Sequence, residues 1–83
     1  MKTVIKYGAG WCGPCKMYNP KFNEAAATIS GVNFQSIDVD SGDPRILEHG
    51  IRNVPTTVVI DENGGIRKQS GVMSVEQLKA FIG

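Results

Sequence analysis

The stretch Trp11-Cys12-Gly13-Pro14-Cys15-Lys16 holds both of the cysteines in this chain. Two cysteines with two residues between them can close a disulfide ring, and the thiolate of one is the nucleophile that opens disulfides elsewhere. A β-type apolar run over residues 3–7 precedes the pair, and a helical pattern follows it. Cys12 is therefore predicted at a helix N-terminus, where free amides and the positive end of the helix dipole favour a thiolate. We expect Cys12 to be the nucleophile and Cys15, on the same side of the first turn, to be the resolving thiol.

The residues around this stretch predict a single α/β domain over residues 1–83, with elements in the order β-α-β-α-β-β-α. Helical spacing of apolar side chains predicts a helix over residues 13–29, with a bend at Pro20, which has no amide hydrogen to donate. Asp43-Pro44 and Gly50 bound a short helix, Asn63-Gly64 indicates a hairpin turn, and Ser74 begins a capping box. The other expected elements are strands over residues 3–7, 32–39, 54–60 and 66–70, the last at a sheet edge, and a final helix over residues 74–82.

The motif Trp-Cys-Gly-Pro-Cys-Lys resembles the active site of thioredoxins. The resemblance extends along nearly the whole chain. Pro20 stands where thioredoxins kink the active-site helix, Val54-Pro55-Thr56 resembles their cis-proline loop, and Gly71 resembles a glycine that faces their active site. The resemblance implies a minimal thioredoxin fold, with a four-stranded mixed sheet flanked by three helices. The strand and helix that precede the active-site strand in full-length thioredoxins have no counterpart in this sequence, whose length is closer to that of glutaredoxins.

The resemblance also implies a function. It is that of a thiol–disulfide oxidoreductase that reduces protein disulfides, with Cys12 and Cys15 as its redox-active disulfide and no further cofactor. The partners implied are disulfide-containing proteins and an NADPH-dependent thioredoxin reductase that restores the dithiol.

Several residues are expected to bind the substrate. Trp11 could belong to the core, but its place beside a nucleophile in a glycine-rich loop favours an exposed docking surface. Gly13-Pro14 starts the helix and holds its first turn rigid, which fixes the distance between the two sulfurs. By resemblance, a cis bond at Val54-Pro55 presents the backbone of Val54 to an extended peptide, and Gly71 allows that peptide a close approach.

Lys6 departs from the thioredoxin pattern, which has here a buried aspartate thought to move protons for the second cysteine. Ser36 likewise replaces a lysine that accompanies that aspartate. Because this strand should be central and covered, the Lys6 ammonium must reach solvent along its stem, find a carboxylate, or stay near the cysteines and lose basicity. Reaching solvent is the simplest arrangement. The alternative hypothesis is that Lys6 serves the resolving step and that its charge favours a thiolate at Cys15 and Cys12.

Composition and charge argue against other classes of function. A chain of 83 residues, 41% hydrophobic and 20% charged, is typical of a soluble globular domain, and a net charge of +1 gives no electrostatic reason to bind nucleic acid or an anionic membrane. The first six residues lack the apolar core of a signal peptide, so we expect a cytoplasmic protein. We also expect it to be a monomer. For a zinc site the cysteine pair would need two more ligands, for which only His49 and carboxylates remain, so no metal is expected.

Two other functions stay open. A glutaredoxin-like enzyme that uses glutathione is suggested by the short length and by Tyr7, at a position that resembles a glutaredoxin tyrosine. Against it, residues 71–74 lack the Gly-Gly and acidic residue that hold glutathione in glutaredoxins. The second alternative is an interaction module whose Trp11, Val54 and Gly71 face binds one partner protein, with redox activity incidental.

Overall fold

A four-stranded sheet, in the order β2-β1-β3-β4, forms the centre of the fold. A computed structural model describes all residues from 1 to 83. β1 (Lys2–Gly8) and β3 (Thr56–Ile60) are central, and β2 (Val32–Asp38) and β4 (Ile66–Ser70) are the edges. β1 is parallel to β2 and antiparallel to β3, which forms an antiparallel hairpin with β4. The expected mixed sheet, with residues 66–70 at an edge, is confirmed.

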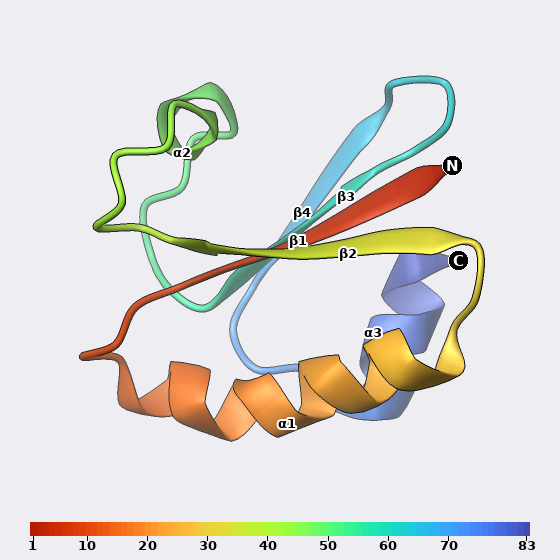
Figure 1. The fold of residues 1–83 in the computed structure, drawn as a ribbon, viewed down its shortest axis with the longest axis horizontal. Coiled ribbons are helices and arrows are strands. Elements are labelled where there is room, and N and C mark those ends of the chain that lie inside the picture. Colours follow the sequence, from red (N-terminus) through yellow and green to blue (C-terminus); the bar gives the residue numbers. More distant parts are fainter.

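Three helices cover the two faces of this sheet (Figure 1). α1 (Gly13–Thr28) and α3 (Val75–Ile82) lie against one face, and the short α2 (Arg45–Glu48) lies beyond the other. The element order is the predicted β-α-β-α-β-β-α. The β1–α1 loop is at one end of the sheet, and both termini are at the opposite end. None of the helices combines the length and the apolar character that a membrane crossing requires.

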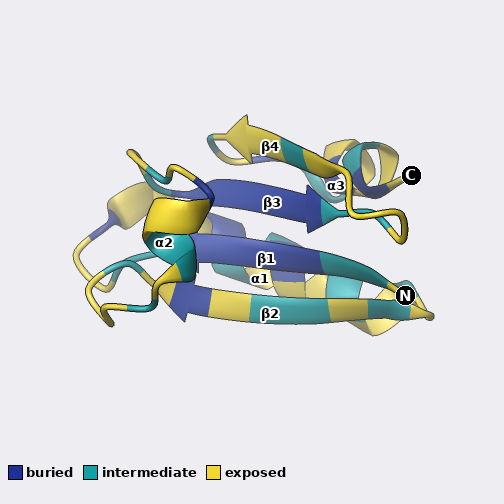
Figure 2. Cartoon of the chain, turned by 90° about the horizontal axis from the view of Figure 1, so that it is seen from above, coloured by how far each residue is buried: buried dark blue, intermediate teal, exposed yellow.

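Each face of the sheet has its own core. The core under α1 and α3 consists of Val4, Tyr18, Phe22, Ala25, Val59, Met73, Leu78 and Ile82. The core on the α2 side consists of Ile5, Tyr7, Ile37 and Val58, with Ile46 and Ile51 packed against them. Figure 2 shows that β3 and most of β1 are buried, whereas β4 is largely exposed, as expected for central and edge strands.

Side chains of β1 alternate between these two cores, because successive residues of a strand point to opposite faces. Val4 belongs to the α1 side and Tyr7 to the α2 side. This alternation puts Lys6 on the α1 side. Lys6 pairs in register with Ser36 on β2 and with Thr57 on β3. A row of polar side chains therefore crosses the sheet beneath α1.

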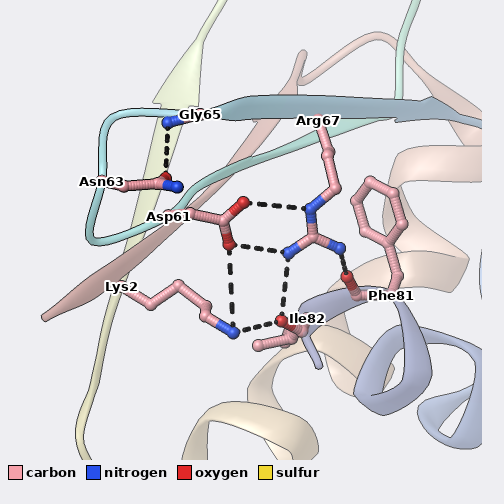
Figure 3. A network of polar contacts seen from close by, with 7 residues as sticks. All are labelled: Lys2, Asp61, Asn63, Gly65, Arg67, Phe81 and Ile82. Atoms are coloured by element: carbon pink, nitrogen blue, oxygen red, sulfur yellow. Dashed lines mark hydrogen bonds and ion pairs between the residues drawn. The ribbon is translucent and has the colours of Figure 1, made fainter.

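A polar network joins the β3–β4 hairpin to the end of α3 (Figure 3). The Arg67 guanidinium pairs with the Asp61 carboxylate at 2.9 Å and donates to the carbonyls of Phe81 and Ile82. The Lys2 ammonium donates to the Ile82 carbonyl at 2.7 Å and lies 3.9 Å from Asp61. These contacts fix the end of the sheet that is far from the cysteines.

The boundaries of several elements differ from the expected ones by one or two residues. The first helix ends at Thr28 with Ile29 as its C-cap, the second strand ends at Asp38, and the third begins after Pro55. The short helix has Pro44 as its N-cap, where Asp43 was expected, although the Asp43 carboxylate accepts the Arg45 amide at 2.9 Å.

The end signals of the short helix and of α3 are confirmed. Gly50 follows the short helix with a φ of +63°, a conformation that glycine adopts readily. At α3 the capping box is complete. The Ser74 hydroxyl accepts the Gln77 amide at 3.1 Å, and the Gln77 side chain accepts the Ser74 amide at 2.9 Å.

Candidate active site

Cys12 and Cys15 form a disulfide at the start of α1. Cys12 is the N-cap residue with extended backbone angles, and its Sγ accepts a hydrogen bond from the Cys15 amide at 3.2 Å. Pro14 lies in the first turn, where its missing amide hydrogen leaves no intrahelical bond unmade. The Cα atoms of the two cysteines are 5.3 Å apart. The turn therefore brings the two sulfurs within bonding distance, as the two-residue spacing predicts.

The two sulfurs differ in their surroundings more than in their exposure. Cys12 is 5% exposed and Cys15 is 3% exposed. Cys15 is therefore shielded as expected, but its exposed fraction is only slightly smaller than that of Cys12. Cys12 Sγ lies 3.7 Å from the carbonyl oxygen of Val54. Cys15 Sγ lies close to Gly8, because a Cβ added to this glycine would be 3.5 Å from the sulfur. Cys12 thus faces the Val54 loop and Cys15 faces the sheet.

The Val54-Pro55 loop, which faces Cys12, is joined to a second backbone segment at Gly71. The Val54-Pro55 peptide bond is cis, as expected. The Gly71 amide donates to the Pro55 carbonyl at 2.8 Å. Gly71 has a φ of +95°, a backbone conformation that is strained in residues with a side chain. The Thr56 hydroxyl, which donates to the Asn53 carbonyl at 2.7 Å, holds the loop from its other side. Gly71 therefore lies against the Val54-Pro55 loop.

Trp11 is a surface residue, and the core alternative for it is wrong. Its side chain is 70% exposed, and its indole nitrogen donates to the Asp40 carboxylate at 2.9 Å. Trp11 and Val54 line one groove of about 480 Å³, whose other lining residues are Val39, Ile46, Ile51, Arg52 and Asn53. Five of these seven residues are hydrophobic, so an apolar groove begins beside the cysteine pair.

The Lys6 side chain does not extend to the outer surface of the protein, and it has no carboxylate partner. It is only 8% exposed, and its ammonium donates to the Asn19 side-chain oxygen and lies 5.2 Å from the centre of the Phe22 ring. Burial lowers the pKa of this ammonium, because the charged form loses solvation. The expectation that Lys6 extends to solvent is wrong. The strand alternation puts its stem in the core, and Asn19 supplies the acceptor that water would have supplied.

Comparison with known proteins agrees with this geometry. The thioredoxin family model matches residues 1–83. The chain belongs to the thioredoxin family. A thioredoxin of Mycoplasmoides gallisepticum is 32% identical over 81 residues, covering 98% of this chain and 81% of that protein. A mitochondrial thioredoxin of Mus musculus is 31% identical over 81 residues, covering 96% of this chain and 49% of that protein.

Solved thioredoxins superpose on nearly the whole of this chain. The thioredoxin of Fasciola hepatica superposes with a TM-score of 0.87 at 30% identity, covering 98% of this chain and 77% of that chain. Chloroplastic thioredoxin z gives a TM-score of 0.86 at 26% identity, covering 100% of this chain and 76% of that chain. With its redox-active Cys12–Cys15 disulfide, this member of the thioredoxin family is a protein thiol–disulfide oxidoreductase. Thioredoxins act on disulfide-containing substrates and are returned to the dithiol form by a reductase.

The structure removes one of the two reasons for expecting a glutaredoxin-like use of glutathione. Tyr7 is fully buried on the α2 side of this thioredoxin fold, and its hydroxyl lies 2.7 Å from His49 Nδ1. His49 is itself buried and meets the Tyr7 ring edge-on. A side chain enclosed in this way does not face a ligand at the cysteines. Tyr7 instead holds α2 against the sheet.

Asp40 and Asn19 belong to the site but were missed by the sequence analysis. Asp40 orients Trp11 across a gap of 29 positions in sequence, for which no local signal exists. Asn19 holds Lys6, and its position four residues after Cys15 places both side chains on one face of α1. The helical spacing could therefore have indicated Asn19. The remaining predicted residues, Gly13 and Pro14, are exposed in the first turn beside Cys12.

Proposed function

We propose that this thioredoxin-family chain works in the reducing direction, with Cys12 as the nucleophile and Cys15 as the resolving thiol. In the first step the Cys12 thiolate attacks one sulfur of a protein disulfide and forms a mixed disulfide with it. The other substrate sulfur leaves as a thiolate and takes a proton from solvent. In the second step Cys15 loses its proton and attacks Cys12 Sγ. The Cys12–Cys15 bond forms, the bond to the substrate breaks, and the second substrate thiolate is protonated.

Both steps balance. The substrate disulfide is reduced to two thiols, and the two thiols of the chain are oxidised to one disulfide. A reductase must then return two electrons to the Cys12–Cys15 disulfide before the next turnover.

One observation carries the assignment of the nucleophile, namely that Cys12 Sγ is the N-capping group of α1. The sulfur accepts the Cys15 amide at 3.2 Å and lies at the positive end of a helix of 16 residues. A hydrogen bond from an amide and a helix dipole both stabilise a thiolate more than a thiol. Cys12 is therefore the sulfur that this geometry favours as a thiolate in the reduced protein.

The substrate is proposed to bind along the surface formed by Trp11, Val54-Pro55 and Gly71, with Gly13-Pro14 exposed beside Cys12. Support comes from the Val54 carbonyl, which lies 3.7 Å from Cys12 Sγ, so a peptide in extended conformation along Val54 would bring its disulfide to the sulfur. The groove of about 480 Å³ beside Trp11 would accept an apolar side chain of that peptide. Backbone pairing with a single apolar contact is tolerant of sequence, which suits a reductase with many protein substrates.

The electron donor is proposed to be an NADPH-dependent thioredoxin reductase. The proposed location is the cytoplasm, where the chain would act as a monomer in electron transport and redox homeostasis. Support for the donor is the family membership and the burial of Tyr7, which leaves glutathione without that contact.

The experiment follows reduction of insulin disulfides with three separate donors. The donors are NADPH with a thioredoxin reductase, glutathione with NADPH and glutathione reductase, and dithiothreitol alone. We expect turnover with the first, background with the second, and faster insulin precipitation than dithiothreitol gives by itself in the third. A Cys12→Ser variant should be inactive in all three. Faster turnover with glutathione would overturn the proposed donor, and no acceleration over Cys12→Ser in any arm would overturn the reducing direction.

A further inference from the structure

Lys6 is the only lysine, arginine, aspartate or glutamate among the buried residues. The ion pairs of the protein are Lys2–Asp61, Arg45–Asp43 and Arg67–Asp61, so Lys6 has no carboxylate partner. Its ammonium is held by a single side-chain acceptor, the Asn19 oxygen. Burying a charge without a countercharge costs free energy, and such charges are typical of sites where they act on a neighbouring group.

The neighbour is Cys15. Lys6, Asn19 and Cys15 line one cavity of about 330 Å³ between β1, β2 and α1. Asn19 follows Cys15 by one helical turn, and Gly8, two residues after Lys6 on the same face of β1, is the residue against which Cys15 Sγ packs. The cavity reaches the surface at its exposed rim, and a space of this size admits water. The buried ammonium and the buried sulfur therefore share one small solvated space.

Few other ionisable groups face this cavity. From β2 only Asp38 lines it, at the exposed rim, and its carboxylate would oppose a thiolate at Cys15. Near Cys15 in the sequence, Cys12 is its disulfide partner, and on α1 the Tyr18 hydroxyl is bonded to Thr57. Lys16, which follows Cys15, is exposed and does not line the cavity. Burial raises the pKa of Tyr18 and therefore keeps it neutral. From β3 the facing residue, Thr57, is uncharged. Lys6 is thus the one cation that lines this cavity together with Cys15.

We propose that the Lys6 ammonium, held in place by Asn19, is a positioning charge that stabilises the thiolate of Cys15 during the resolving step. The inference rests on the proposed roles of the two cysteines. In the mixed disulfide, Cys15 must lose its proton to water in the cavity before its sulfur can attack Cys12 Sγ. Lys6 keeps its own proton. Its positive charge, near a sulfur with little access to solvent, favours the ionised form and so raises the fraction of Cys15 that can react near neutral pH.

The test isolates this step with 5,5'-dithiobis(2-nitrobenzoate) in stopped flow. The reduced protein releases one coloured thiolate when Cys12 attacks, at a rate that depends on reagent concentration. It releases the second when Cys15 resolves, at a rate that does not. Because Cys12 is then blocked, the pH profile of the second phase follows the titration of Cys15. We expect Lys6→Met to move the midpoint of that profile up by about one pH unit, so that resolution slows about tenfold below the midpoint. At high pH the two proteins should converge.

Lys2→Met is the matched control, because it removes the same charge from the same strand at the end far from the cysteines. It should leave the midpoint of the second phase unchanged. Asn19→Ala tests the positioning without removing the charge. It should raise the midpoint in the presence of Lys6 and have no further effect in a Lys6→Met background. Unfolding curves of each variant establish that it is folded at the temperature of the assay.

An unchanged midpoint in Lys6→Met, or equal shifts in Lys6→Met and Lys2→Met, would overturn the inference and leave Lys6 as a packing residue. Should Lys6→Met fail to fold, an unchanged midpoint in Asn19→Ala would overturn it as well. These outcomes are separate from a failure of the proposed function. If wild-type protein gives only the first phase, or labels Cys15 in that phase, the assigned roles of the cysteines fail. If it gives both phases in the expected order but the second phase has the same midpoint in wild type and in Lys6→Met, only the role of Lys6 fails.

Discussion

The hydrogen bond between Tyr18 and Thr57 joins the active-site helix to the central strand β3, and its loss has a calculable effect. The two hydroxyl oxygens are 2.7 Å apart, and both side chains are fully buried. Thr57→Val keeps the branched shape of the side chain and leaves the Tyr18 hydroxyl without its partner in the core. Tyr18→Phe leaves the Thr57 hydroxyl unpaired in the same way. In each case a buried polar group loses its only side-chain partner.

An unpaired buried hydroxyl costs about 1–3 kcal/mol, so each single variant should lose about 2 kcal/mol of unfolding free energy. For a domain of this size, 1 kcal/mol corresponds to about 4–8 °C in Tm, so each variant should melt about 8–16 °C lower. The double variant, Thr57→Val with Tyr18→Phe, removes both hydroxyls and leaves none unpaired. Its unfolding free energy should lie within about 1 kcal/mol of wild type, because replacing both partners by apolar groups is nearly neutral.

The assay is urea unfolding of the four oxidised proteins, followed by circular dichroism at one temperature and pH. The coupling energy is the difference between the loss of unfolding free energy in the double variant and the sum of the losses in the two single variants. We expect it to offset most of that sum. If the losses instead add to within about 0.5 kcal/mol, as they do for independent sites, the hydrogen bond does not hold α1 on β3 and the reasoning is refuted.

Three further predictions concern single sites. Cys15→Ser should accumulate a stable mixed disulfide through Cys12 that mass spectrometry detects after reaction with a disulfide substrate, whereas product release at the wild-type rate would contradict the resolving role. Ser74→Ala should lower the unfolding free energy by about 1 kcal/mol through loss of the α3 cap, and an unchanged melting curve would contradict this. The hydrogen bond from the Arg45 side chain holds the pKa of Asp43 at about 2, so the stability that it contributes is present above the unfolded value of about 4 and is lost as pH falls toward 2. Asp43→Asn should therefore flatten the fall of unfolding free energy with acid over that range, and an identical slope would count against the pair.

Features with a local signal could be read from the sequence. Cys12 and Cys15 lie in one helical turn, so their meeting follows from the chain itself, and the same holds for the Ser74 capping box and for Gly50 at a helix end. These features depend on neighbours at most four residues away.

Features that depend on tertiary packing could not be read in this way. Lys6 was expected at solvent because its acceptor, Asn19, comes from another element, and only the crossing of α1 over β1 brings the two together. Tyr7 resembled a ligand-binding tyrosine, but its partner His49 is 42 positions away and encloses it. The family resemblance supplied the Val54-Pro55 loop, whereas no pattern pointed to the hydrogen bond that holds Trp11.

The central claim is that Cys12 attacks and Cys15 resolves, and competition between the two thiols for a limiting alkylating agent tests it most directly. The fully reduced protein is treated near pH 7 with less than one equivalent of iodoacetamide, the remaining thiol is blocked with a second reagent under denaturing conditions, and each label is located by peptide mass spectrometry. Capping of α1 by Cys12 Sγ predicts that nearly all of the first label is on Cys12. Equal labelling, or a first label on Cys15, would contradict the account.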